Sequence, residues 1–226
     1  VIMLVSKMLL RSRWLVAILI EGFVTIAVEV LVLRQLQPVV GNSVIVTSTV
    51  LGVVLLSMAL GYYQGGKPTS DPLRRLRVNF FIASVMIGLG LSSLFVTVFF
   101  YGIAFSLMAS FFSLLLFYLI FIIAPAIYCL AQTAPTIMNN LSQQLSAGRI
   151  GGTVLAYSTI GSFFSTIAVT LILLQYVGVA WTIVVISVLP LLLYVLFQSS
   201  PRVIATYANS VLVVVVAAMS FYLLNV

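Results

Sequence analysis

The chain has 226 residues, of which 63% are hydrophobic and 6% charged, with ten basic side chains, three acidic side chains and no histidine. Because soluble domains carry about 25% charged residues, this composition excludes a soluble globular domain and predicts an integral membrane protein. One cysteine excludes an internal disulfide, and three widely separated acids match no familiar pattern of metal ligands, so we expect neither metal nor cofactor.

The apolar runs are long and lack strict alternation, which favours membrane helices over a barrel. A spanning helix needs roughly 20 apolar residues. On that basis we predict about seven spans, at residues 14–36, 43–63, 78–101, 107–130, 151–177, 180–197 and 203–224. The expected fold class is all-α, a polytopic membrane helix bundle that forms a single transmembrane domain over residues 1–226.

The basic residues test this count of spans. If the helices alternate in direction, the following basic residues all fall on one side of the membrane: Lys7, Arg11, Arg13, Lys67, Arg74, Arg75, Arg77, Arg149 and Arg202. Arg34 alone falls on the other side. Basic residues gather in cytoplasmic loops, so the pattern predicts a cytoplasmic N-terminus and an external C-terminus. The net charge of +7 is therefore attributed to topology and not to nucleic-acid binding.

Two prolines, Pro125 and Pro135, bracket the end of the fourth predicted span, and the sequence after them turns polar. Proline removes a helical hydrogen bond and clashes with the preceding turn. We expect a kink or break near Pro125 and a short interfacial helix after Pro135. A simple proline kink and a functional break are equally compatible with this pattern.

Small residues recur at four-residue spacing and predict close helix contacts, because packing drives helix association in lipid. Four such rows are present: Ser57–Gly61–Gly65, Ser84–Gly88–Ser92, Gly148–Gly152–Ala156 and Ser158–Ser162–Thr166. We interpret them as packing surfaces, with a substrate path as the alternative. The predicted span 151–177 is the most polar, so we expect it inside the bundle.

The first predicted span carries two of the three acids, Glu21 and Glu29, and also Arg34. Measured from Trp14, Glu21 lies about 10 Å and Glu29 about 22 Å into the helix. The two carboxyls are about 80° apart around the axis and can share one broad face. Glu29 and Arg34 are about 140° apart, so we expect Arg34 to reach the headgroups instead of pairing.

An ionised carboxylate at the depth of Glu29 costs several kcal/mol unless it is paired or solvated. Glu29 is therefore either protonated or faces a polar cavity, for which the candidate lining residues are Tyr157, Ser158 and Thr159. The functional interpretation is a substrate or proton site formed by these residues with Glu21 and Arg34. The structural interpretation is a buried strut that ties the first span to the second or the fifth.

The stretch LGYYQGGKPTSDPLRRLRV is the most motif-like polar segment. Three glycines permit a tight turn close to neighbouring backbones: Gly61, Gly65 and Gly66. Asp71 can cap the next helix or accept hydrogen bonds from Arg74 and Arg75. The segment resembles the loop between helices two and three of major facilitator transporters, and a solvated loop that only sets topology is the alternative.

A wider resemblance covers about residues 20 to 180. The stretch from Glu29 through Arg34 to the Gly-rich turn resembles the N-terminal membrane domain of bacterial spermidine-synthase-like proteins, with Val32 at a position where that family has tryptophan. A later run resembles the second half of that domain through Gly148, Gly151, Tyr157, Ser158, Thr159, Gly161 and Ser162. The resemblance implies a multi-pass protein of the bacterial inner (plasma) membrane, fused to or encoded beside a soluble aminopropyltransferase-like domain.

The residues needed for aminopropyl transfer are not present in this chain, and no nucleophile–base pair is visible, so we do not expect an enzyme. The first hypothesis is a transporter-like membrane protein or subunit that handles a small solute, with a cation such as a polyamine in view. The alternative is a non-catalytic membrane anchor or assembly subunit. It would pack against other membrane subunits or recruit a soluble spermidine-synthase-like partner, and in either case the lipid bilayer is the main contact.

Overall fold

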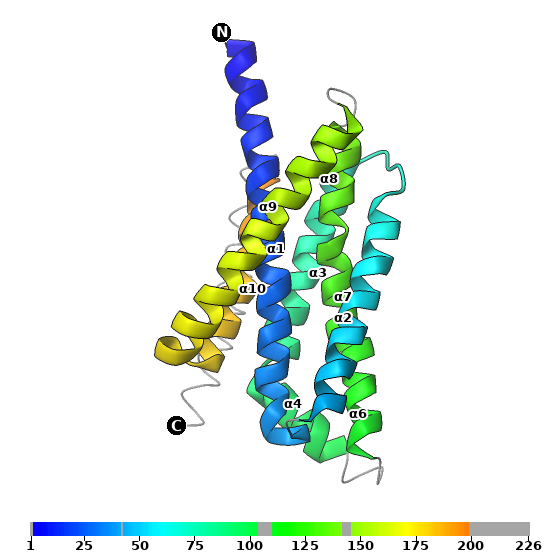
Figure 1. Cartoon of the computed structure of the whole chain (residues 1–226), viewed down its shortest axis with the longest axis vertical. Coiled ribbons are helices and arrows are strands. Elements are labelled where there is room, and N and C mark those ends of the chain that lie inside the picture. The colour runs from blue at the N-terminus through cyan, green and yellow to red at the C-terminus, as the bar shows by residue number, and fades with distance from the viewer. Residues whose placement is uncertain (1, 42, 104–109, 142–145, 199–226) are drawn as a thin grey trace.

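The computed structural model describes residues 2–41, 43–103, 110–141 and 146–198, and these parts of the chain are helical (Figure 1). The α-helices are α1 (Ile2–Val40), α2 (Val44–Gly65), α3 (Pro72–Gly90), α4 (Ser93–Thr97), α6 (Phe111–Tyr118), α7 (Ala124–Ala131), α8 (Thr133–Leu141), α9 (Ala147–Ile167) and α10 (Val179–Leu196). Three π-helical segments interleave with them: η1 (Val98–Ile103), η2 (Leu119–Ile123) and η3 (Ala168–Val177). The all-α fold class is confirmed.

Five helical stretches are long and apolar enough to cross a membrane: Ser12–Val40, Val44–Gly65, Phe111–Leu141, Ala147–Val177 and Val179–Leu196. The pair Pro72–Gly90 and Ser93–Gly102 counts as a sixth if its two parts form one span. The chain is therefore a multi-pass membrane protein. The seventh predicted span, 203–224, lies outside the described residues.

The third span, expected over 78–101, is not one continuous helix, because it bends by 63° between α3 and α4. Tyr118 on α6 donates its hydroxyl to the carbonyl of Gly90 at 2.8 Å, and Ser92 caps α4 by accepting from the Phe95 N–H at 3.3 Å. A Cβ on Gly90 would overlap the side chain of Ile122. The bend thus has partners for the backbone groups that it frees from the helical ladder, as a membrane interior requires.

The fourth span passes through both prolines, where a kink or break near Pro125 and a short interfacial helix after Pro135 were expected. α6, η2, α7 and α8 follow one another over Phe111–Leu141 as one candidate span. Pro125 lies in the first turn of α7 directly after η2, and a π-helical turn is a common way for a helix to absorb a local irregularity. Pro135 lies in the first turn of α8, where its missing N–H would have no helical partner anyway.

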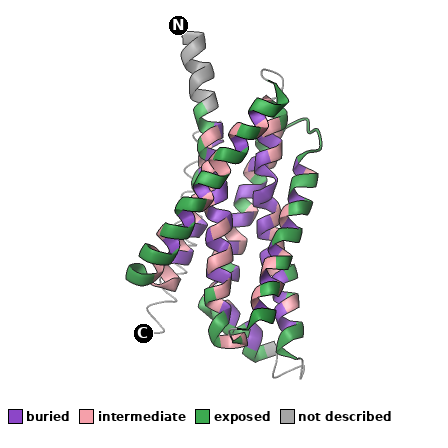
Figure 2. Ribbon diagram, in the orientation of Figure 1, coloured by how far each residue is buried: buried purple, intermediate pink, exposed green. Residues whose placement is uncertain are grey.

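The burial pattern places α1 at the centre and α9 at the edge of the bundle. Figure 2 shows buried residues where helices face one another, whereas α9 is exposed along most of its length. In the most apolar 18-residue stretch of the span Ala147–Val177 only 17% of the residues are buried, against 56% in that of the first span, so the expectation that it lies inside the bundle is wrong. Its buried residues Ile150, Val154, Gly161 and Ser165 form one narrow stripe, while its other faces carry the exposed apolar side chains Leu155, Ile160, Phe163 and Phe164.

Two of the four small-residue rows differ in whether another helix packs against them. Gly61 and Gly65 are buried against the α7–α8 region, and a Cβ on either would lie 2.7 Å from a backbone oxygen, that of Tyr128 and that of Gln132 respectively. This row is therefore a close helix contact, as predicted. Around Gly148 and Gly152 nothing lies within 4 Å of a Cβ, so that row packs against no described residue.

Substituting Gly61 by alanine tests the α2–α7 contact, with Gly52 as a matched control on the same helix. Gly61→Ala forces a methyl group against the α7 backbone and should lower stability by about 1–3 kcal/mol. Gly52→Ala has open space around it and should leave stability unchanged or slightly higher, because alanine favours the helix. Thermal unfolding in detergent measures both, and equal melting temperatures would contradict the described contact.

Candidate functional site

α1 and α9 cross with their backbones in direct contact. Gly22 on α1 faces Ser158, and a Cβ on Gly22 would overlap the Ser158 carbonyl oxygen. Gly161 on α9 faces Leu19 in the same way, and a Cβ there would overlap the Leu19 carbonyl oxygen. Small residues at such a crossing let two helix backbones approach closely, which increases van der Waals contact in a solvent that offers no hydrophobic drive. We call this region the α1–α9 crossing.

The carboxyl of Glu21 lies inside this crossing. Glu21 is only 1% exposed, and Ser158 donates its hydroxyl to Glu21 Oε2 at 3.2 Å. One turn along, Ser162 donates to the Gly22 carbonyl at 3.1 Å. Thr25 donates to the Glu21 carbonyl at 2.9 Å within α1. Glu21 is therefore hydrogen-bonded as a strut between the first span and α9, a role that the sequence suggested for Glu29.

Glu29 does not share this environment. It is half-buried, and within the described parts of the chain it has no hydrogen-bond partner. Ser158, which was expected to face Glu29, is bonded to Glu21 instead. Tyr157 is partly buried against the hydrophobic core, whereas Thr159 is exposed. The structure thus brings together Glu21 and Ser158 from the expected set and shows no bond from this set to Glu29.

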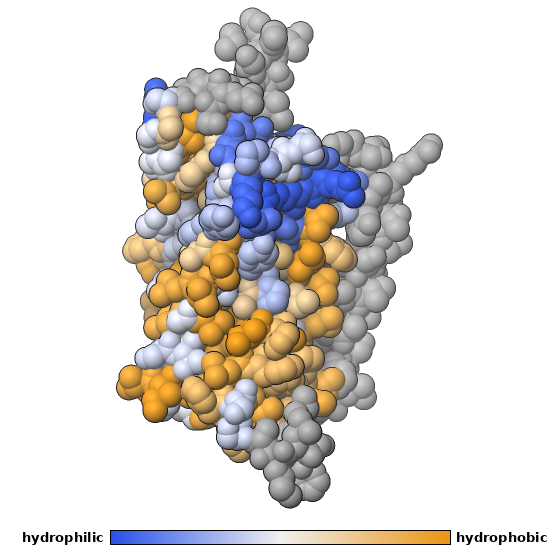
Figure 3. Space-filling model, turned by 90° about the vertical axis from the view of Figure 1, so that its right-hand side faces the viewer, coloured by the Kyte–Doolittle hydropathy of each residue, from blue (hydrophilic) through white to orange (hydrophobic). Residues whose placement is uncertain are grey.

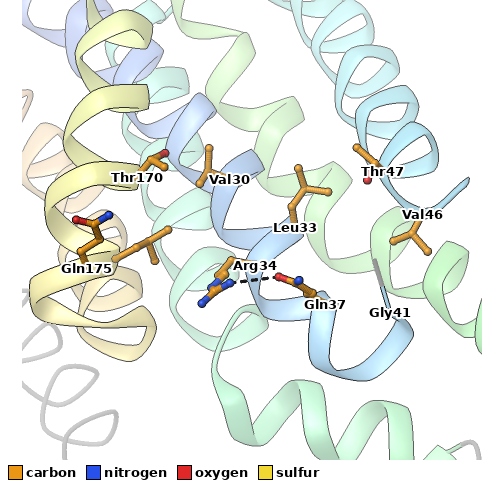
Figure 4. A pocket seen from close by; sticks show the side chains of 10 residues that line it. Val30, Leu33, Arg34, Gln37, Gly41, Val46, Thr47, Thr170 and Gln175 are labelled. Atoms are coloured by element: carbon orange, nitrogen blue, oxygen red, sulfur yellow. Dashed lines mark hydrogen bonds between the residues drawn. The ribbon is translucent and has the colours of Figure 1, made fainter. Parts of the chain in front are cut away.

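Arg34 lines a cavity of about 450 Å³ at the far end of α1 (Figure 4). Its guanidinium donates to Gln37 Oε1 at 3.3 Å and is otherwise exposed. The figure shows Arg34 directed from α1 towards the segment that carries Thr170 and Gln175. The whole lining comprises Val30, Leu33, Arg34, Gln37, Gly41, Val46, Thr47, Thr170, Leu174 and Gln175. We call it the Arg34 cavity.

Sequence reasoning identified Arg34 but missed its neighbours. The carboxamides of Gln37 and Gln175 and the hydroxyls of Thr47 and Thr170 come from three separate segments, α1, α2 and η3. The only nearby sequence feature that pointed to Gln37 was its position next to a proline at the end of the first predicted span. Thr47 lies on the next helix, and Thr170 and Gln175 lie far away in sequence, so only the fold brings them to the arginine.

The opposite end of the bundle is held by Arg75. This residue donates from Nε to Gln132 Oε1 at 3.0 Å, from Nη1 to the Lys67 carbonyl at 3.3 Å, and from Nη2 to the Gln64 carbonyl. It thereby joins the end of α2, the start of α3 and the α7–α8 junction, and we call these bonds the Arg75 clamp. Asp71 caps α3 by accepting from the Arg74 N–H at 2.9 Å, which confirms its expected capping role.

A second cavity, of about 320 Å³, lies beside this clamp and is called the Lys67 cavity. Asn139 donates to the Gly66 carbonyl at 2.7 Å across it, and the Lys67 ammonium lies 4.6 Å from the centre of the Tyr63 ring. Its lining residues are Gly65, Gly66, Lys67, Pro68, Thr69, Pro72, Thr136, Asn139 and Asn140. Figure 3 shows hydrophilic surface gathered at one end of the molecule above a broad apolar surface.

No group of three histidine, cysteine, aspartate or glutamate side chains among the described residues could hold a metal ion. The chain matches no protein-family model, no curated protein and no solved structure. The resemblance to spermidine-synthase-like membrane domains therefore stays a prediction from the quoted residues.

The strut role of Glu21 predicts how its variants behave. Glu21→Gln keeps an oxygen that accepts from Ser158, so its melting temperature should stay close to that of the parent chain. Glu21→Ala removes a buried partner and leaves the Ser158 hydroxyl unpaired, which should cost about 1–3 kcal/mol. Glu29→Ala is the control, because it breaks no hydrogen bond, and its stability in detergent should change less. If Glu21→Ala is as stable as Glu29→Ala, Glu21 is not a strut.

Proposed function

We propose that the chain is a transporter-like multi-pass membrane protein, without enzymatic activity, that moves a small solute between the two sides of the bilayer. The observation that carries this proposal is the pair of cavities at opposite ends of α2. The Arg34 cavity includes Val46 and Thr47 in the first turn of α2, and the Lys67 cavity includes Gly65 at its end. A 22-residue helix places these ends about 33 Å apart, roughly the thickness of a membrane core.

The region between the cavities is closed by packing. On the buried face of α2, Val50 is fully buried, Val54 is 1% exposed and Ser57 is 4% exposed. A continuous pore is therefore not open along this face of α2. Two cavities separated by a packed middle favour a carrier that exposes its site to one side at a time over a static channel.

The charges that line the cavities favour a different solute from the one first expected. Arg34 and Lys67 are basic, and none of the described residues that line either cavity is acidic. Glu21, the acid most suited to a buried cation site, is engaged in the α1–α9 crossing. We therefore propose an anionic or polar solute in place of a polyamine.

The anchor or assembly subunit remains the second candidate, and one observation favours it. α9 presents the row Gly148–Gly152–Ala156 and its apolar neighbours on a surface that no described residue covers. Such a row lets another membrane helix approach closely. A neighbouring subunit or the membrane part of a spermidine-synthase-like partner is the kind of protein that would use it.

For orientation, we propose that the end with the Arg75 clamp faces the cytoplasm. Among the described residues, that end contains the α2–α3 connection with Lys67, Arg74, Arg75 and Arg77, whereas Arg34 lies at the other end. Basic residues close to span ends set this orientation during insertion. The bacterial inner membrane is the expected location.

The orientation can be tested with single cysteines in a chain that carries Cys129→Ala. Thr47→Cys, in the Arg34 cavity, should react with a membrane-impermeant maleimide added to intact cells. Thr69→Cys, in the Lys67 cavity, should react only after the cells are lysed. The reverse pattern would overturn the proposed orientation, and the parent without cysteine provides the background.

The carrier proposal can be tested without knowing the solute. Ser57→Cys, in the Cys129→Ala background, places a thiol of similar size on the closed stretch of α2. A carrier must open this stretch to water, so an impermeant methanethiosulfonate reagent should modify the cysteine slowly, at least about tenfold below the rate at Thr47→Cys.

A static anchor keeps the packed middle closed. In that case Ser57→Cys should stay unmodified from both sides of the membrane, while Thr47→Cys reacts as before. Melting temperatures of the two variants confirm that both are folded when they are labelled.

A further inference from the structure

Among the residues that the structure describes, the positive charge of Arg34 has no counter-ion. Only three acidic residues exist in the sequence. Glu21 accepts from Ser158 on the other helix, and Asp71 caps α3 at the opposite end of the bundle. Glu29 is five residues before Arg34 and does not line its cavity. An anion that neutralises Arg34 is therefore none of the acidic side chains of this sequence.

The surroundings of Arg34 indicate what kind of anion fits. Among the described residues the guanidinium bonds one neutral partner, Gln37, and it has five N–H groups in total, so most of its donors lack a partner there and can bind a ligand. Gln175 and the hydroxyls of Thr47 and Thr170 line the same cavity and can donate further hydrogen bonds. Carboxylates and phosphates are the anions that a guanidinium binds with two parallel hydrogen bonds.

The remaining walls of the cavity are aliphatic. Val30, Leu33, Val46 and Leu174 line it beside the polar groups. A small inorganic anion would leave these side chains against water, whereas an alkyl chain would cover them and gain about 0.8 kcal/mol per buried methylene group. The volume of about 450 Å³ falls within the usual range for small-molecule sites.

We propose that the Arg34 cavity binds an anionic amphiphile, with its carboxylate or phosphate head on Arg34 and its alkyl chain along the aliphatic wall. The ligand is either a lipid of the surrounding bilayer or a free fatty acid that enters from the water. This inference names the class of solute for the proposed function, and it rests on that function only because it treats the Arg34 cavity as a ligand site. The binding experiment does not measure translocation. The binding proposal and the carrier proposal, which is tested by labelling Ser57→Cys, can therefore fail separately.

The test uses the full chain in nanodiscs of zwitterionic phosphatidylcholine and measures equilibrium binding of radiolabelled dodecanoate. Arg34→Gln should weaken binding at least about tenfold, and Arg34→Lys should retain most of it because the charge remains. Arg74→Gln is the matched control, since Arg74 is exposed at the opposite end and its removal changes the net charge equally. Dodecyltrimethylammonium, a cationic amphiphile, should not compete.

A second arm separates the two sources of the ligand. The chain is prepared in nanodiscs that contain phosphatidylglycerol, and native mass spectrometry counts the lipids that stay bound. Retention of phosphatidylglycerol that Arg34→Gln removes identifies a bilayer lipid, whereas dodecanoate binding without such retention identifies a free amphiphile.

Three results would overturn the proposal: unchanged dodecanoate and phosphatidylglycerol binding in Arg34→Gln, an equal loss in Arg74→Gln, or equal competition by the cationic amphiphile. Thr170→Phe provides a variant that leaves Arg34 intact. Because Thr170 is exposed in the cavity, a phenyl group there should occupy the space for the alkyl chain and weaken dodecanoate binding without unfolding the chain. Unaltered binding in this variant as well as in Arg34→Gln excludes the cavity as the site.

Discussion

The contact of two bare backbones at Gly22 and Gly161 is the constraint on which the arrangement of α1 and α9 depends. Any side chain at either position would meet a carbonyl oxygen of the facing helix. The close approach also brings the Ser158 and Ser162 hydroxyls within hydrogen-bonding distance of α1, and so gives the buried Glu21 carboxyl its partner. In lipid, where polar groups have no water to bind, the packing and the hydrogen bonds therefore depend on each other.

The same principle operates on the other side of the bundle with different residues. Gly61 and Gly65 let α2 lie against the α7–α8 region, and this approach brings Gln132 within reach of Arg75. The Gln64 carbonyl near the end of α2 and the Lys67 carbonyl just after it then accept from the same guanidinium. The two glycine contacts and the polar groups beside them thus hold α9 against α1 and α2 against the α7–α8 region. The Arg34 cavity lies between α1 and η3, where the described residues form no such glycine contact.

Composition and hydrophobic runs predicted the membrane class and most span positions, because those follow from the thickness of the bilayer. They could not predict the 63° bend after Gly90, which depends on a hydroxyl donated by Tyr118, 28 residues away. The pairing of Glu21 with Ser158 was missed for a similar reason. Angles around one helix place Glu21 and Glu29 on one broad face, but only the crossing decides which of them meets α9. The exposure of α9 could not be predicted, because the number of polar residues in a helix does not say how much of its surface packs against other helices.

The separation of partners along the chain affects how the protein is made. Glu21 and Ser158 are 137 positions apart, so at about 5–20 residues per second the first helix enters the membrane roughly 7–27 s before its partner leaves the ribosome. Arg75 likewise has no Gln132 to bond until the chain has grown by a further 57 positions. Throughout that interval the carboxyl must be neutral, hydrated or sheltered by the insertion machinery. The late arrival of α9 then makes the insertion of α9, and not that of the first helix, the step that commits α1 to its final place.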